Sequence, residues 1–308
     1  MATEMAAAFK SGFVAIVGRP NAGKSTLVNR LVGHKVAIVS PRPQTTRNRI
    51  QGIANREDAQ VVLIDTPGMH KPATALGRQM MEEFAAALDA INVLALLVDA
   101  SEESGPGGRW ALERVKRFGG TKFLLPNKID LIPKTRLLPL IARCSRECEF
   151  AEIIPVSALT GGGVDLLLER LINYLPEHAP YFPPDQYTDQ PERFLAAEII
   201  REKAIACTYD EVPHAVAVLV DSFEETAKLI RIRATIRVER EGQRGILIGR
   251  GGEMLKKIGT AARRELEELL GVKIFLELYV KVQRDWREKP ALVRQLDWRR
   301  QLEQLSKE

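Results

Sequence analysis

A glycine-rich segment near the N-terminus has the residues and spacing of a phosphate-binding loop. The segment from Gly18 to Ser25 fits the pattern G-x-x-x-x-G-K-[ST], follows an apolar run and opens a helical pattern. Glycines let backbone N–H groups turn toward phosphate oxygens, and the helix that follows adds its positive end. We expect Lys24 to reach the β- and γ-phosphates of a nucleotide and Ser25 to bind Mg²⁺. The residues expected to line this site are Gly18, Arg19, Pro20, Asn21, Ala22, Gly23, Lys24, Ser25 and Thr26.

Two polar segments are expected to complete the phosphate and metal site. Asp65-Thr66-Pro67-Gly68 ends the run VVLID, so Asp65 is carried to the carboxyl end of a strand, where sheets of this kind bind ligands. We expect Asp65 to hold Mg²⁺ through water, the Gly68 N–H to reach the γ-phosphate, and Thr66 and Pro67 to line the nucleotide site with them. Between the two motifs, Gln44-Thr45-Thr46-Arg47 lies in a polar loop. There we prefer Thr46 to Thr45 as a further Mg²⁺ ligand.

A third motif carries groups suited to a guanine base. Asn127-Lys128-Ile129-Asp130 follows the run KFLLP. Guanine presents N1–H and N2–H as parallel donors, and one carboxylate accepts both, so Asp130 is the expected specificity residue. Adenine would leave this carboxylate unpaired, and such a site discriminates by a factor on the order of 10⁴. Asn127 is expected to bind guanine N7 and to tie loops together, while the stem of Lys128 packs on the base.

The next apolar run ends in Ser157-Ala158-Leu159, where the Ala158 N–H is expected to read guanine O6. Each of these turns is common by itself. In this order, each at the end of an apolar strand, they indicate a protein that binds and hydrolyses GTP. The candidate catalytic residues are Lys24, Thr46 and Asn21.

A second glycine-rich turn lies in a basic part of the chain. Gly249-Arg250-Gly251-Gly252 stands between a short apolar segment and a basic amphipathic helix, as in a KH motif, which clamps about four nucleotides of RNA. Residues 228–264 hold eleven Lys or Arg and three Glu, a net charge of +8 that favours phosphate backbones. A helix–turn–helix hinge on a solvated basic face is the alternative. The residues expected to bind RNA are Ile248, Gly249, Arg250, Gly251, Gly252, Lys256 and Lys257.

A proline-rich segment divides the chain into two parts, each with its own pattern of predicted helices and strands. Before it, strand-like runs alternate with helical patterns, which predicts a mostly parallel sheet with helices on both faces. The runs span 13–18, 61–65, 93–99, 122–127 and 152–157, and the helical patterns lie near 24–33, 76–90, 107–118, 134–147 and 163–174. Five prolines between Leu175 and Pro191 then prevent regular structure.

After the prolines the pattern becomes α+β. It predicts a helix over 192–207, strands near 214–221 and 229–239, the glycine-rich turn, a helix over 253–270 and a strand over 273–282. We therefore expect a GTPase domain over 1–175, a linker over 176–191 and an RNA-binding domain with a helical tail over 192–308.

Composition excludes several other classes of protein. With 308 residues and 45% hydrophobic content, the chain has enough apolar residues for two cores. The most apolar stretch, 85–100, is too short and too polar to cross a membrane, and Glu4 is out of place in a secretory signal. Three cysteines make no disulfide framework, so we expect reduced thiols and a cytoplasmic protein.

Together these motifs resemble those of the translation-factor-related GTPases, and within them the Era family. The resemblance covers about residues 10–175 and 192–290, including FLELYVKVQRDW at 275–286. It implies an α/β P-loop GTPase domain followed by an α+β type II KH-like domain, with GTP or GDP and Mg²⁺ as cofactors. It also implies binding to the 3′ end of 16S ribosomal RNA, a role in assembly of the 30S subunit, a monomeric state, and peripheral association with the inner face of the cell membrane.

Two positions bear on the rate of hydrolysis. Many GTPases place Gln after D-x-x-G to orient the attacking water, but here the residue is Met69, so slow intrinsic turnover is expected. In similar GTPases an Asn at the position of Asn21 helps to bind K⁺ against the phosphates, and capping of the loop is the other interpretation. An RNA-binding protein that keeps GTP as a structural ligand is the main alternative function. The base motif argues against a small-molecule kinase.

Overall fold

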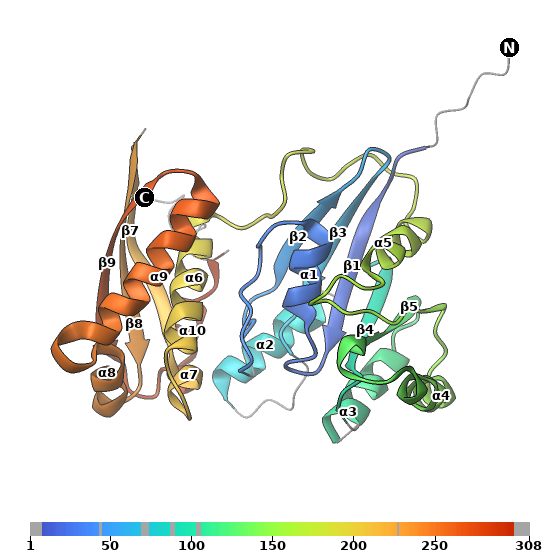
Figure 1. The fold of residues 1–308 in the computed structure, drawn as a ribbon, viewed down its shortest axis with the longest axis horizontal. Helices are drawn as coiled ribbons and strands as arrows, with labels where there is room; N and C mark the ends of the chain where they lie inside the picture. The colour runs from blue at the N-terminus through green and yellow to red at the C-terminus, as the bar shows by residue number, and fades with distance from the viewer. Residues whose placement is uncertain are drawn as a thin grey trace, which may run out of the picture. The chain divides into compact units, whose positions relative to one another are not determined.

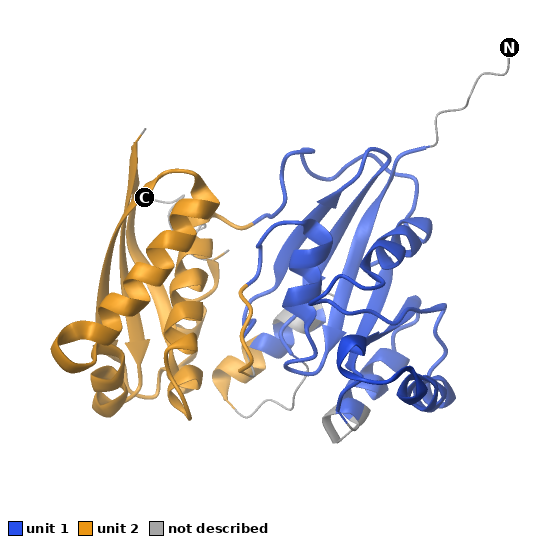
Figure 2. Ribbon diagram, viewed as in Figure 1, with its two compact units in different colours: residues 1–37, 44–71, 80–189 blue, residues 38–43, 72–79, 190–308 orange. Residues whose placement is uncertain are grey.

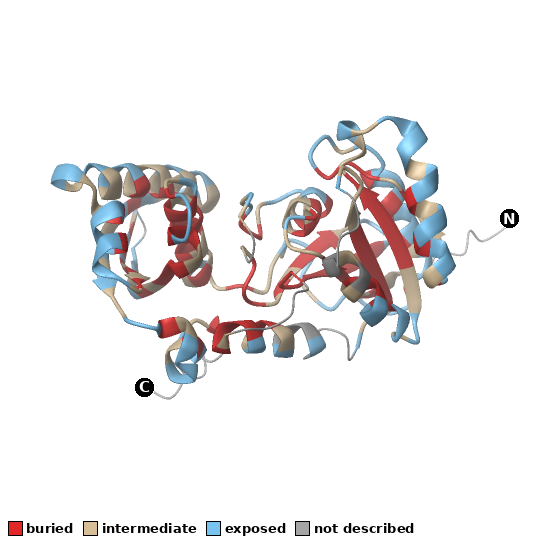
Figure 3. Ribbon diagram, turned by 90° about the horizontal axis from the view of Figure 1, so that it is seen from below, coloured by how far each residue is buried: buried red, intermediate tan, exposed pale blue. Residues whose placement is uncertain are grey.

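Runs of small and branched apolar residues form the strands that carry the first group of motifs. The computed structural model describes residues 8–42, 45–68, 74–86, 90–102, 106–226 and 228–298. The chain divides into two units, one of residues 1–37, 44–71 and 80–189, the other of residues 38–43, 72–79 and 190–308 (Figure 2). Buried residues form a core within each unit (Figure 3).

The first unit is built on a six-stranded sheet with the order β2-β3-β1-β4-β5-β6 (Figure 1). Neighbouring strands run parallel, except that β2 runs antiparallel to β3. The strands are β1 (Lys10–Gly18), β2 (Ile50–Asn55), β3 (Ala59–Asp65), β4 (Val93–Asp99), β5 (Thr121–Asn127) and β6 (Glu152–Ile153). The predicted mostly parallel sheet is confirmed.

Helices cover both faces of this sheet, because alternate strand residues are apolar on both sides. Leucines and valines of α1 and α5 pack with Val14, Ile16 and Leu63 on one face. Residues of α3 and α4 pack with Ala15, Val17 and Leu94 on the other. The helices of this part are α1 (Lys24–Val32), α2 (Ala75–Ala86), α3 (Pro106–Lys116), α4 (Leu137–Glu147) and α5 (Val164–Asn173).

Two strands differ from the sequence prediction. Strand β2 was not predicted, since IQGIAN has no continuous apolar run; it pairs Gln51 with Ile64 at the edge of the sheet. Strand β6 is shorter than the predicted 152–157. Main-chain bonds from Ile154 to Leu124 and from Val156 to Pro126 nevertheless keep the segment beside β5 up to the S-A-L turn.

The proline-rich segment has no helix or strand beyond isolated bridges, as its prolines predict. It is nevertheless bonded to the first unit. The Ser11 N–H donates to Pro176 O at 3.1 Å, and the Ile53 N–H donates to Tyr187 O at 2.9 Å. The side chain of Gln60, buried, accepts the N–H groups of Tyr181 and Phe182. The segment is therefore bonded to β1, β3 and β2, three neighbouring strands of this unit.

The second unit contains a three-stranded sheet in the order β7-β8-β9, in which β7 and β8 are antiparallel and β8 and β9 parallel. Apolar residues of α6 and α9 pack on one face of it (Figure 1). Its elements are α6 (Glu192–Ala206), α7 (Val212–Ala215), β7 (Ala217–Glu225), β8 (Leu229–Val238), α8 (Glu241–Ile248), α9 (Glu253–Leu270), β9 (Lys273–Val282) and α10 (Pro290–Arg294). The predicted α+β layout is confirmed. Among the described residues, no helix is both long and apolar enough to span a bilayer.

Candidate functional site

The segment between β1 and α1 turns tightly enough to present its main chain to a ligand. Asn21 and Gly23 adopt left-handed φ values of 63° and 98°. A Cβ atom at Gly18 would lie 2.4 Å from the carbonyl oxygen of Leu97, so packing requires glycine there. Helix α1 begins at Lys24, which places its first N–H groups at the end of the loop. This is the backbone geometry of a phosphate cradle.

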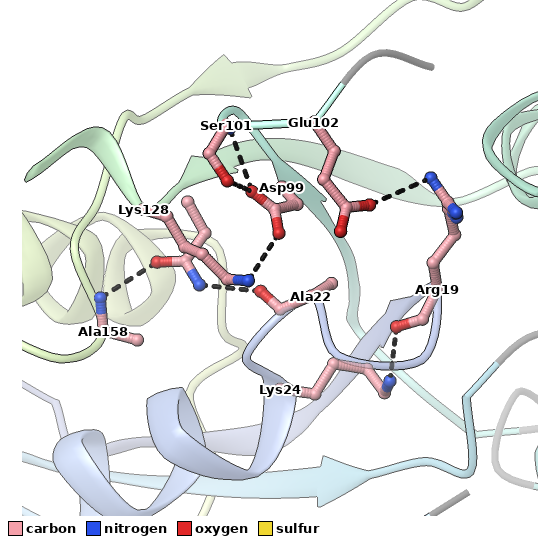
Figure 4. Close-up of polar contacts among 9 residues, drawn as sticks. Arg19, Ala22, Lys24, Asp99, Ser101, Glu102, Lys128 and Ala158 are labelled. Carbon is pink, nitrogen blue, oxygen red and sulfur yellow. Dashed lines mark hydrogen bonds and ion pairs between the residues drawn. The ribbon is translucent and has the colours of Figure 1, made fainter. Parts of the chain in front are cut away.

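Lys24 is buried at the start of α1 and is held by this loop. Its ammonium donates to Gly18 O at 3.4 Å and to Arg19 O at 3.0 Å (Figure 4). Burial lowers the pKa of Lys24 to about 8, while the carboxylate of Asp65 acts in the opposite direction. A phosphate beside this ammonium would favour its charged form.

The three predicted metal ligands come from separate segments and meet. Ser25 Oγ lies 2.6 Å from Asp65 Oδ2 and 2.9 Å from Thr46 Oγ1, and Thr46 Oγ1 lies 3.2 Å from the same carboxylate oxygen. Within the described part of the chain, the other oxygen, Asp65 Oδ1, is buried without a hydrogen-bond partner. Burial raises the pKa of Asp65, against the effects of Lys24 and the two hydroxyls. Two hydroxyls and a carboxylate with an unused oxygen are hard ligands that fit Mg²⁺.

The Asp65–Gly68 segment approaches the phosphate loop closely. A Cβ atom at Gly68 would lie 2.9 Å from the Cα of Pro20. Thr66 departs from the prediction, because its buried hydroxyl donates to Ile16 O at 2.9 Å and joins β3 to β1. Its side chain therefore serves the sheet and is not available to a nucleotide. Pro67 is buried beside it.

Asn127 connects the phosphate loop to the S-A-L turn. It is buried, its Nδ2 donates to Ala22 O at 2.7 Å, and its Oδ1 accepts the Ala158 N–H at 2.9 Å. The predicted tie between loops is therefore present. The predicted contact of the Ala158 N–H with guanine O6 would require this bond to be exchanged or shared.

The remaining base-site residues are differently exposed. Asp130 is exposed in a 3₁₀ turn over Ile129–Leu131, and Lys128 before it has a left-handed φ of 64°. Ser157 is buried and its hydroxyl accepts the N–H of Thr160 at 3.1 Å, which shapes the turn. Leu159 is exposed. Asp130 is thus free of packing, as a residue that contacts a base edge must be.

Sequence reasoning missed two residues beside the base motif. The Lys128 ammonium lies 2.5 Å from a carboxylate oxygen of Asp99, and Ser101 donates to the same carboxylate (Figure 4). The signal was present, because β4 ends in an acid after an apolar run, as β3 does at Asp65.

Some predicted residues lie elsewhere or outside the described part. Arg19 points to Glu102 at 3.5 Å (Figure 4), and Asn21 is exposed. Thr26 is half-buried in α1. Gln44 and Met69 lie outside the described residues.

The predicted RNA loop is an exposed turn between α8 and α9. Gly249, Gly251 and Gly252 have left-handed φ values of 74°, 58° and 84°. A Cβ atom at Gly249 would lie 2.8 Å from that of Met254, whereas at Gly251 and Gly252 it would meet open space. The first glycine is therefore needed for packing, and all three for their backbone conformation. Arg250 is exposed at the tip.

The side chains near this loop form only part of a basic surface. Lys256 and Lys257 are exposed on α9, and Ile248 is half-buried before the loop. Arg231 and Arg233 project from the other face of the sheet, because their neighbours in β8 are buried against α9 and α6. The +8 stretch is therefore divided between two faces of the unit and is not the single footprint expected from the sequence.

Comparison with known proteins assigns the class. Residues 13–126 match a family described as 50S ribosome-binding GTPase, and residues 211–287 match the KH domain family. With the phosphate cradle and the G-x-x-G loop in place, the chain is a P-loop GTPase joined to a KH domain.

Solved structures narrow this to one family. A variant of Aquifex aeolicus Era bound to GDP and AlF₄⁻ is 41% identical, with a TM-score of 0.89 over 94% of this chain and 99% of that chain. An Era structure with MgGDPNP and nucleotides 1506–1542 of 16S ribosomal RNA is 42% identical, with a TM-score of 0.90 over the same shares. The chain belongs to the Era family of GTPases.

Proposed function

We propose that this GTPase binds GTP and GDP with Mg²⁺ at the site around Lys24, binds the 3′ end of 16S ribosomal RNA at the G-x-x-G loop, and so assists assembly of the 30S subunit. The observation that carries the first half is the meeting of Ser25, Thr46 and Asp65, which come from three segments, with a buried carboxylate oxygen left unpaired. Mg²⁺ held there would bridge phosphate oxygens and neutralise developing charge.

The residues of the chain supply the positioning. The backbone N–H groups before α1 orient the phosphates, and Lys24 gives up its carbonyl partners for a phosphate oxygen. Asp130 accepts the two guanine donors, and Asn127 keeps the phosphate loop and the S-A-L turn together. Asn21, exposed in the loop, is proposed to hold K⁺ beside the phosphates in place of an arginine finger.

The proposed RNA binding rests on the geometry of the G-x-x-G loop and on the Era structure that contains 16S ribosomal RNA. The relative bound to nucleotides 1506–1542 matches this chain over 94% of its length. Three of the four loop residues are glycines with positive φ, so a phosphate backbone can approach Arg250 and the lysines of α9. We place this activity in the cytoplasm, by family membership.

Crosslinking in cells tests the proposal. Protein and RNA are crosslinked, and the recovered RNA is sequenced for the wild type and for the variant Arg250→Asp with Gly251→Asp. We expect wild-type reads concentrated at the 3′ end of the small-subunit RNA, and loss of that concentration in the variant. Reads spread equally over unrelated RNAs in both proteins would contradict it.

A further inference from the structure

The loop after β4 touches both parts of the nucleotide site. Asp99 is the last residue of β4, and the described part of the loop that follows runs from Ala100 to Glu102. Asp99 pairs with Lys128 of the base motif, and Glu102 pairs with Arg19 of the phosphate loop (Figure 4). The two pairs differ in burial, since the side chain of Asp99 is 8% exposed and that of Glu102 is 56% exposed.

The carboxylate of Asp99 is held by Ser101 as well as by Lys128. One of its oxygens accepts the Ser101 N–H at 2.9 Å and the Ser101 hydroxyl at 2.6 Å, and the other lies 2.5 Å from Lys128 Nζ. Asp99 also lies opposite Asn127 in the β4–β5 register, and the Ala100 N–H donates to Asn127 O at 2.9 Å. The acid is therefore anchored to the strand end from which the base motif starts.

Lys128 is held at both ends as a result. Its backbone has a left-handed φ of 64°, and its ammonium is paired with a buried carboxylate. A free lysine side chain loses rotamer entropy when it is ordered. In this chain the ordering occurs in the folded protein before a nucleotide arrives, which is the condition for preorganised binding. The ammonium is committed to Asp99, so the apolar stem is the part offered to a ligand.

We infer that Asp99, fixed by Ser101, is a positioning residue for guanine-nucleotide binding that holds the stem of Lys128 in place to pack on the base. The inference rests on the proposed role of Lys128 in the base site. It predicts an effect on affinity without an effect on base selectivity, because a packed stem contacts any purine, whereas Asp130 reads the guanine donors.

A double-mutant cycle on the full chain tests the inference. The dissociation constants of GDP and IDP are measured for the wild type, Asp99→Asn, Lys128→Met and the double variant. We expect Lys128→Met and Asp99→Asn each to weaken GDP binding by about three- to tenfold, and Asp99→Asn to change affinity less than twofold when Lys128 is already Met. The ratio of GDP to IDP affinity should stay at its wild-type value in all three variants.

Further variants separate a specific effect of Asp99 from general effects on the loop or on folding. Glu102→Gln removes a neighbouring acid of the same loop and should leave affinity within twofold, since its pair is exposed. Asp99→Glu should recover part of the loss. If Asp99→Asn does not fold, Ser101→Ala, which removes the hydroxyl bond to the same carboxylate and keeps the main-chain one, should weaken GDP binding by about twofold, again only when Lys128 is present.

Two results would overturn the inference, and they differ. If Lys128→Met weakens binding while Asp99→Asn has no effect, or the two effects add, Asp99 does not act through Lys128. If Lys128→Met has no effect, the ion pair does not position the stem and the inference fails, because methionine keeps an apolar stem of similar length. If Lys128→Ala, which removes the stem, has no effect, the proposed role of Lys128 in the base site is itself wrong.

Discussion

The nucleotide site and the RNA loop are built on opposite principles. Lys24, Asp65 and Asn127 are buried and bonded to other parts of the site, with 0–6% of each residue exposed. Arg250 and Gly251 are exposed in a turn where a Cβ atom at Gly251 or Gly252 would meet open space. The residues of the nucleotide site therefore also belong to the core of their unit. Those of the RNA loop lie outside the core of theirs. Substitutions in the nucleotide site should disturb binding and folding together, and those at Arg250 and Gly251 should disturb binding far more than folding.

Asp130 is the exception in the nucleotide site, and it gives the largest expected effect on ligand choice. It is exposed, so Asp130→Asn should leave the free energy of unfolding unchanged. GTP affinity should fall on the order of 10³-fold or more, because one acceptor for two guanine donors is replaced, while xanthosine triphosphate should bind better. Nucleotide titrations check this. Unchanged GTP affinity would show that the base site is wrongly assigned.

Asn127→Ala should lower both the stability of the protein and its affinity for GTP. It leaves Ala22 O and the Ala158 N–H without their partner in a buried place. The nucleotide-free protein should lose about 2–4 kcal/mol of stability, and GTP affinity should fall as well. Urea unfolding and nucleotide titration on the same samples measure the two losses. A variant that loses affinity at full stability would break the contrast between the two regions.

A monovalent cation should affect the rate by a smaller factor. If K⁺ sits against the phosphates beside Asn21, replacing Na⁺ by K⁺ should accelerate single-turnover hydrolysis by about tenfold. Asn21→Ala should remove that difference between the salts. Equal wild-type rates in the two salts would dismiss the cation and leave the phosphate loop as assigned.

The pKa of Lys24 gives the smallest effect, visible as proton uptake. In the nucleotide-free protein burial lowers this pKa to about 8, so above pH 8 the amine is mostly neutral. Bound phosphates favour the ammonium, so nucleotide binding should take up about one proton near pH 9 and almost none near pH 6.5. Affinity should accordingly decline as pH rises past 8. Calorimetry in buffers of different ionisation enthalpy measures the uptake, and a Lys24→Arg variant should show none at pH 9.

The same contrast explains how far the sequence could predict the molecule. Long apolar runs predicted β1, β3, β4 and β5, and motif spacing predicted that Ser25, Thr46 and Asp65 would meet. Strand β2 was not predicted, because it mixes apolar and polar residues and its pairing with β3 is decided by tertiary contacts. The pairing of Asp99 with Lys128 and the inward bond of Thr66 depend on side-chain directions that spacing does not give.

Net charge summed along the sequence was a poor guide to how charges are distributed over the surface. A sum over residues 228–264 treats the stretch as one surface, but the period of two in β8 turns Arg231 and Arg233 away from the face that packs on α9. The charges of Arg231 and Arg233 therefore do not add to those of the loop and α9. The loop, and not the whole stretch, should therefore dominate RNA binding.

We propose above that this GTPase holds RNA at its exposed G-x-x-G loop. The most direct measurement compares RNA affinity of the wild type and of Arg250→Asp with Gly251→Asp, using a single strand from the 3′ end of 16S ribosomal RNA at two salt concentrations. Arg233→Asp with Thr235→Asp makes the same change in net charge on the other face of the sheet and serves as the control.

The loop variant should lose RNA affinity on the order of 10²-fold or more at low salt, and wild-type binding should weaken steeply with salt. The loop variant should keep its fold and its GTP affinity, and the control should lose far less RNA affinity. Equal RNA affinities of the wild type and a folded loop variant would contradict the claim.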